Sequence, residues 1–259
     1  MVKLLILVLH SIDPFYSKMM KIHSAYLDFI KNKIPGFNWY KYIIQNDGKG
    51  DRIDNETNTI IIDGVKEKLV YRKIRIKFYR VVNLIQNKDF DYIIRINEST
   101  TINYMYLKHL LTQKPLDYGG KTWLLSPNKR VPEYNIVDDR FSKYAYVSGR
   151  CIILSKKSIT LLLDTWINYP KIIYDTIDDI SIAQVLSIHN IFARCPSKHF
   201  NCLYKGLSFN TYKKNFAFLS HNSNDYKKTR ENDPQFLKHT INLLINYIQE
   251  NQFALDNQK

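Results

Sequence analysis

Cysteine is scarce in this chain of 259 residues: three are present, and no two have CxxC spacing. An odd count without paired spacing, at Cys151, Cys195 and Cys202, argues against a disulfide scaffold and against a zinc ribbon. Long apolar runs are also lacking. The N-terminal run, Leu4 to Leu9, is too short for a signal peptide's hydrophobic region plus cleavage site, and far too short to span a bilayer. We therefore expect a soluble protein of a reducing, cytoplasmic compartment, without a transmembrane segment.

Acidic residues are the second shortage. The chain has 24 Asp and Glu against 38 Lys and Arg, which gives a formal net charge of +14. Such a basic chain attracts polyanions, and nucleic acid, an anionic membrane surface in peripheral contact, and a nucleoside-diphosphate substrate are all candidates. The apolar fraction of 45% is typical of a globular protein and excludes a disordered one.

Residues 1–110 alternate between strand and helix patterns. Short apolar runs that predict buried strands occupy 3–11, 37–46, 58–64 and 90–97, and helical spacing occupies 14–33, 66–87 and 102–111. This alternation predicts an α/β fold with a mainly parallel central sheet flanked by helices. Ligands of such sheets bind at the carboxyl ends of the strands. Asn97, Glu98 and Ser99 follow the fourth strand, so we expect them at a binding site.

The second half is less regular. Strand patterns cover 117–126 and 144–155, the latter interrupted by Ser148-Gly149, and 127–144 reads as a loop. Helices are predicted over 156–168, over 174–190 and from Asp233 to about Gln249. Asp178 and Asp179 open the second of these helices, where the helix dipole favours a carboxylate.

Three segments in this order resemble the β1,3-glycosyltransferases of the Fringe and β3-galactosyltransferase type. "FDYIIRINESTTIN" (90–103) is similar to the strand that carries that family's metal-binding aspartates. "YVSGRCIILS" (146–155) and "IDDISIAQVL" (177–186) are similar to a later strand and a later helix start, with Ala183 where the family has Gly. "DYGGKTW" (117–123) resembles the segment between them, and the resemblance covers roughly residues 1–225.

The resemblance implies a GT-A (Rossmann-like) fold in a single domain, residues 1–259. Within it we expect a nucleotide-sugar-binding half (1–110), an acceptor half (111–230) and a C-terminal amphipathic helix (231–259). The implied reaction is an inverting hexosyl transfer from a nucleoside-diphosphate sugar, with UDP-sugar first, to a hydroxyl of a glycan or glycoprotein. Most eukaryotic relatives are anchored in the Golgi. We therefore expect a viral or bacterial source, and the Golgi lumen only for a chain trimmed of its anchor.

The resemblance also assigns roles to residues. A carboxylate takes the proton of the acceptor hydroxyl in an inverting transfer, and the aligned candidates are Asp179, which we prefer, and Asp178. Negative charge develops on the leaving diphosphate and needs cationic partners. The candidate cations are Lys73, Arg95, Lys121 and Arg150. Trp123 and Tyr146 are candidates for stacking on sugar rings. The residues expected to bind the donor are Asn97, Glu98, Ser99, Lys73, Arg95, Gly149 and Arg150.

The chain departs from the family at the metal site. The three aligned aspartates are replaced by Asn97, Glu98 and Ser99. Two alternatives follow for the cofactor: Mn²⁺ held by Glu98 and His221, or a metal-independent mechanism in which Lys or Arg side chains stabilise the diphosphate.

Two other readings stay open. The same replacements are also expected in a catalytically inactive GT-A relative that binds nucleotide sugar or glycan without transferring it. The net charge alone allows a basic nucleic-acid-binding protein. We expect no specific nucleic-acid partner, because the chain has no zinc finger, RNP or helix-turn-helix signature.

Overall fold

The computed structural model describes residues 1–11, 13–64, 71–124, 145–169, 178–196, 217–219 and 233–256. The strands are β1 (Leu4–Leu9), β2 (Phe37–Ile44), β3 (Arg52–Asp54), β4 (Thr59–Ile62), β5 (Tyr92–Asn97), β6 (Thr100–Ile102), β7 (Tyr118–Leu124), β8 (Ala145–Ser155) and β9 (Ala217–Leu219). The helices are α1 (Pro14–Lys33), α2 (Tyr71–Ile85), α3 (Tyr104–Gln113), α4 (Lys156–Asn168), α6 (Asp178–Ile188) and α8 (Asp233–Asp256).

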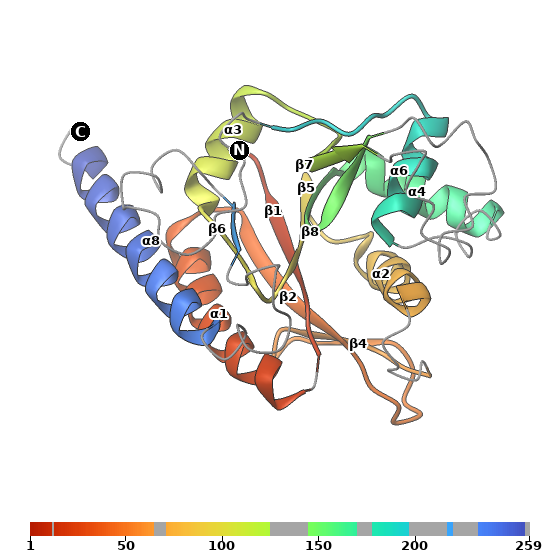
Figure 1. Cartoon of the computed structure of the whole chain (residues 1–259), viewed down its shortest axis with the longest axis horizontal. Helices are drawn as coiled ribbons and strands as arrows, with labels where there is room; N and C mark the ends of the chain where they lie inside the picture. Colours follow the sequence, from red (N-terminus) through yellow and green to blue (C-terminus); the bar gives the residue numbers. More distant parts are fainter. Residues whose placement is uncertain are drawn as a thin grey trace.

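A seven-stranded sheet in the order β3-β4-β2-β1-β5-β8-β7 forms the centre of the fold (Figure 1). Strands β4, β2, β1 and β5 are parallel, whereas β3 and β8 run antiparallel to their neighbours. Strand β7 is antiparallel to β8 and therefore points the same way as the parallel strands. The predicted fold class, α/β with a mainly parallel sheet flanked by helices, is confirmed, and this architecture is consistent with a GT-A domain.

Apolar side chains on both faces of the central strands create two cores. Ile6 and Ile94 point into one core, which α1, α3 and α8 cover, and Leu7 and Ile93 point into the other, beneath α2, α4 and α6. Figure 1 shows α1 and α8 on one side of the sheet and α2, α4 and α6 on the other. A strand buried on both faces has no polar alternation, which explains the continuous apolar runs of the sequence.

The predicted helix starts are found where capping residues stand. Asp13 caps α1, with its carboxylate accepting from the Phe15 amide at 2.9 Å, and Pro14 is the first helical residue. Ser155 caps α4 in the same way. No helix in the described part of the chain is long and apolar enough to cross a membrane.

Two short strand pairs were not predicted. Strand β3 forms a hairpin with β4, and β6 pairs with β9 in a separate two-stranded sheet. Strands β3 and β6 have three residues each, too few for a periodic pattern to be visible in the sequence. The final helix α8 extends to Asp256, past the predicted end at Gln249. The predicted loop 127–144 lies outside the described residues.

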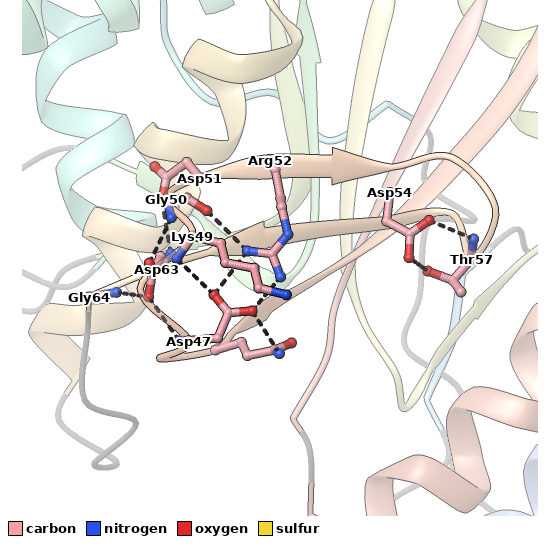
Figure 2. Close-up of polar contacts among 10 residues, drawn as sticks. Asp47, Lys49, Gly50, Asp51, Arg52, Asp54, Thr57, Asp63 and Gly64 are labelled. Atoms are coloured by element: carbon pink, nitrogen blue, oxygen red, sulfur yellow. Dashed lines mark hydrogen bonds and ion pairs between the residues drawn. The ribbon is translucent and has the colours of Figure 1, made fainter.

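The loop between β2 and β3 is closed by Asp63 at the carboxyl end of β4 (Figure 2). The carboxylate accepts backbone hydrogen bonds from Asp47 at 3.2 Å, Gly50 at 2.8 Å and Gly64 at 2.7 Å. The amide of Gly50 contributes most to holding the pKa of Asp63 below its usual range. Two guanidinium nitrogens of Arg52 donate to the Asp47 carboxylate, at 3.0 and 2.5 Å. Asp63 therefore ties this loop to the end of β4, and Asp51, which binds Arg80 at 2.7 Å, ties it to α2.

The strand break predicted at Ser148-Gly149 is a shift of register. Strand β8 is continuous, but its pairing with β7 jumps from Gly120–Ile152 to Thr122–Val147. Gly120 has φ +150°, and a Cβ there would lie 2.3 Å from Val147 Cγ1, so only glycine fits this irregularity. The shift leaves residues 148–151 outside the ladder with β7, and this is the segment from which Gly149 faces α6.

Candidate functional site

Polar residues follow the parallel strands at one edge of the sheet. Leu9 at the end of β1 pairs with Asn97 at the end of β5, so the next residues along each strand, His10 and Glu98, lie side by side. The carboxyl end of β7 reaches the same edge, because β7 runs parallel to β5. Open α/β sheets bind their ligands at such an edge. This is where the fold concentrates the residues singled out from the sequence.

Arg95 is the central side chain of the site. It points from β5 into the core beneath α2, α4 and α6, and 3% of its side chain is exposed. Its guanidinium donates to the Tyr42 hydroxyl at 3.2 Å, to the Gly149 carbonyl and to the Asp178 carboxylate at 2.6 Å. Arg95 is therefore a structural cation that joins β5, β8 and the start of α6, rather than a free cation for a diphosphate.

The two aspartates at the start of α6 are held differently. Asp178 is bound by Arg95, and 13% of its side chain is exposed. Asp179 turns towards β8, where its Oδ2 accepts from the Gly149 amide at 3.2 Å. A Cβ on Gly149 would lie 2.9 Å from Arg95 Nη1 and 3.5 Å from Asp179 Oδ2, so these neighbours fill the space that a larger residue would need. The three motifs of the sequence thus meet at Gly149.

The electrostatic environment of Asp179 favours its protonated form. Burial, and after it the negative charge of Asp178, raise the pKa of Asp179 to about 7. The amides of Gly149 and Ile180 and the charge of Arg95 act in the opposite direction. A carboxyl group with a pKa near neutrality can exchange protons with a hydroxyl at physiological pH.

Asn97 and its neighbours on the turn to β6 form the rim of the site. The side-chain oxygen of Asn97 is buried and has no hydrogen-bond partner among the described residues. Such an acceptor is costly to bury unless a ligand or water supplies a donor. Ser99 and the Arg150 side chain are partly buried, and the Arg150 carbonyl accepts from Thr100 Oγ1 at 3.0 Å.

Glu98 is engaged with β1. It is 3% exposed, and its Oε1 lies against Nδ1 of His10 and accepts from the Ser11 amide at 3.0 Å. Burial raises the pKa of Glu98 above its ordinary value, while His10, the Ser11 amide and the charge of Lys77 lower it. The carboxylate expected to bind a donor or a metal is therefore already paired within the protein.

Sequence reasoning missed His10 and Lys77. Lys77 is 2% exposed, donates to the His10 carbonyl at 3.0 Å, and lies 5.3 Å from the centre of the Tyr42 ring. In the sequence it is one of several basic residues within 66–87, and basic side chains in such a helix usually form a solvated face. A signal for His10 was present: it is the first polar residue after a buried run, as Asn97 is after another. The side chain of Lys73, on the same helix, lies outside the described ones.

The donor set for Mn²⁺ is incomplete in the described part of the chain. No group of three His, Cys, Asp or Glu side chains lies close enough there to hold a metal ion. His221, the expected partner of Glu98, lies outside the described residues. Oxygen-coordinated cations need several carboxylate or carbonyl ligands, and the only carboxylate of the aligned motif, Glu98, is bonded to His10. The described residues do not fit a manganese site.

Two aromatic residues lie at the same edge of the sheet. Trp123 on β7 is 50% exposed, and Tyr146 on β8 is its cross-strand partner. Side chains directly opposite on an antiparallel pair stand on the same face of the sheet. The exposed indole therefore stands on the same face of the sheet as the phenol, which is partly buried against the core beneath α2, α4 and α6. Lys121 is partly buried two residues before Trp123.

Comparisons with known proteins give similarity to solved structures alone. No family model matches the chain, and no curated protein matches it. Among solved structures, the chain is similar to a glycosyltransferase involved in the glycosylation of the major capsid of PBCV-1. The TM-score is 0.48 and the identity 8%, over 92% of this chain and 99% of that chain. At this score the likeness carries no argument about function, which has to come from the site.

Proposed function

We propose that the protein is an inverting glycosyltransferase that moves a hexose from a nucleoside-diphosphate sugar, with UDP-sugar as the first candidate, to a hydroxyl of a glycan or glycoprotein. The observation that carries the proposal is the environment of Asp179. Its carboxyl group has a pKa of about 7 and faces Gly149 at the carboxyl edge of the sheet. Asp178 does not compete for the role, because Arg95 holds it in a buried ion pair.

The reaction needs one base and one displacement. A carboxylate oxygen of Asp179 takes the proton of the acceptor hydroxyl as that oxygen forms a bond to the anomeric carbon. The bond from the anomeric carbon to the diphosphate breaks, and its electron pair leaves with the diphosphate. Attack from the face opposite the leaving group inverts the anomeric centre.

Two further features support a sugar-nucleotide substrate. The buried, unpartnered side-chain oxygen of Asn97 is an acceptor suited to a ribose or sugar hydroxyl. The aromatic pair of Trp123 and Tyr146 offers a flat face for a sugar ring of the acceptor. Both lie at the edge where ligands of parallel sheets bind.

The test is release of nucleoside diphosphate from a panel of nucleotide sugars, with and without glycan acceptors, in Mn²⁺ and in EDTA. Asp179→Asn should lower turnover by about 10²–10⁴-fold while donor binding survives. Asp164→Asn, which changes an exposed acid on α4, is the matched control and should keep wild-type turnover. Retention of more than about a tenth of the turnover in Asp179→Asn would contradict its role as the base.

A second candidate function is a GT-A relative that binds nucleotide sugar or glycan without transfer. The engagement of Glu98 with His10 favours it, since the aligned metal carboxylates are replaced or occupied. Thermal stabilisation by a nucleotide sugar, with no diphosphate released from any donor, would support this candidate over the enzyme.

A further inference from the structure

Glu98 and His10 form a buried pair whose geometry follows from strand register. Leu9 and Asn97 are paired in the parallel ladder of β1 and β5, and the chain continues from them into His10 and Glu98. The Oε1 atom of Glu98 accepts a hydrogen bond from the Ser11 amide and also lies against Nδ1 of the imidazole. Because Oε1 is already an acceptor for the amide, we assign the carboxylate as acceptor and Nδ1 of His10 as donor. A carboxylate bonded to Nδ1 holds the ring in one orientation.

The negative charge of Glu98 is offset by the protein itself. Lys77 brings an ammonium group to the His10 carbonyl, and its charge acts on Glu98 to favour the ionised carboxylate. A divalent cation requires carboxylate charge that is not already offset, because neighbouring positive charge repels it. An Mn²⁺ ion on Glu98 would share the carboxylate with the bonds that Oε1 makes to His10 and Ser11, and the charge of Lys77 would repel it.

The other ring nitrogen of His10 is available to a ligand. Nε2 of His10 has no hydrogen-bond partner among the residues that the structure describes, whereas Nδ1 and both backbone groups of His10 are bonded. The ring stands directly after β1, at the carboxyl edge of the parallel strands. In the imidazolium form, with Nδ1 donating to the Glu98 carboxylate, Nε2 also carries a proton and is a donor suited to an anionic oxygen.

We propose that Glu98 is a positioning residue for His10 and not a metal ligand, and that the Nε2–H group of the His10 imidazolium donates directly to an oxygen of a nucleoside diphosphate. The proposal rests on the proposed function, which supplies this substrate class. Lys77, which donates to the His10 carbonyl, adds positive charge to this cluster. The donor edge of this protein thus replaces the metal with side chains of β1 and α2.

The experiment measures binding of UDP and of GDP by calorimetry, in EDTA and in Mn²⁺, for the wild type and three variants. His10→Asn keeps a donor near the Nδ1 position but lacks Nε2. His10→Gln places an amide near Nε2 but loses the contact with Glu98. Glu98→Gln keeps the acceptor oxygen without the charge. His109→Asn, at an exposed histidine of α3, is the control.

The two roles of Glu98 predict different results. If Glu98 positions His10, nucleotide affinity is the same within about twofold in EDTA and in Mn²⁺, and Glu98→Gln weakens binding equally in both buffers. His10→Asn weakens binding by about tenfold or more, the equivalent of one hydrogen bond to a charged group, with its melting temperature kept. A merely structural role of His10 predicts the reverse for His10→Asn: a lower melting temperature and unchanged affinity.

Three outcomes would overturn the proposal. The first is Mn²⁺ raising nucleotide affinity tenfold or more, with Glu98→Gln abolishing only that gain. The second is wild-type affinity in His10→Asn. The third is no binding of UDP or GDP in either buffer; the proposed transferase activity would then still be judged separately, by diphosphate release across the donor panel.

Discussion

Arg95 on β5 and Asp178 at the start of α6 are 83 residues apart in sequence, and their charged groups lie 2.6 Å apart in the interior of the protein. The same guanidinium binds the Gly149 carbonyl and the Tyr42 hydroxyl. One side chain therefore sets the position of the helix that carries Asp179. Through Arg95, the three motifs that are far apart along the chain contact one another in the structure.

Arg95→Met is expected to destabilise the protein by about 3–5 kcal/mol, because Asp178 is left as a buried, unpaired charge. Urea denaturation at pH 7 measures the free energy of unfolding. Lys157→Met breaks an exposed pair with Asp117 and should cost less than about 1 kcal/mol. Adding Asp178→Asn to Arg95→Met should recover part of the loss. Equal costs for the buried and the exposed pair would contradict the structural role of Arg95.

Turnover is expected to depend on pH through Asp179. The base must be ionised to accept a proton, and its pKa is raised to about 7 by burial and by Asp178. The rate at saturating donor should therefore rise about tenfold per pH unit below about 7 and level off above it. Rates measured from pH 5 to 9 test this, with Asp164→Asn giving the same profile. A flat profile between pH 5 and 8 would point to another base.

The same ionisation affects stability, with the opposite sign to an ordinary paired carboxylate. The pKa of Asp179 is raised to about 7 in the folded protein, whereas the unfolded chain releases this proton near the ordinary aspartate pKa of 3.8. Stability from this group is thus present at low pH and lost as pH rises to about 7. The melting temperature of Asp179→Asn relative to wild type should increase between pH 4 and 8, while that of Asp164→Asn should not change.

Gly149→Ala tests the close approach of Arg95 and Asp179. The added Cβ would lie 2.9 Å from Arg95 Nη1, so the guanidinium has to move. The carboxylate of Asp179, which accepts from the Gly149 amide, would then be displaced as well. Turnover should fall by at least about tenfold, as expected when a reacting group is displaced by a fraction of an ångström. Gly48→Ala is the control, because φ is +71° there and nothing lies within 4 Å. It should cost about 1 kcal/mol of stability and leave turnover unchanged.

His23→Leu is expected to stabilise the protein in acid. His23 on α1 is fully buried, neither ring nitrogen has a partner among the described residues, and burial lowers its pKa to about 4. The unfolded chain binds a proton near pH 6.5, so the wild type loses about 3 kcal/mol through this group as pH falls from 7 to 4. Urea denaturation at both pH values should show that His23→Leu lacks this loss. The exposed His109→Leu should behave as wild type.

Much of the fold could be read from the amino-acid order because its elements are locally encoded. Strands such as β1 and β5 are continuous apolar runs since both faces are covered, and α1 begins where Asp13 and Pro14 favour a helix start. The three-residue strands β3 and β6 were not predicted, because they are recognised by their pairing with β4 and β9 and not by their composition.

The candidate site was predictable only in part. Asn97, Gly149 and Asp179 were singled out from motif order, and all three stand near Arg95 or at the end of its strand. The preference for Asp179 over Asp178 came from the resemblance alone. The contacts that distinguish the two aspartates, and the partner of Glu98, could not be inferred, since both depend on segments far apart in sequence. Lys77 shows the same limit: a lysine in a basic helix gives no local sign that its ammonium will be buried.

Local preferences and apolar periodicity thus determine the strands, the helices and the edge of the sheet where polar residues gather, because those signals act over a few neighbouring residues. Tertiary structure alone decides the chemistry of that edge. The register of β1 against β5 brings His10 to Glu98, and the packing of α6 against β8 brings Asp179 to Gly149. Burial then sets charges and proton affinities, since desolvation depends on everything packed around a group and not on its neighbours in the chain.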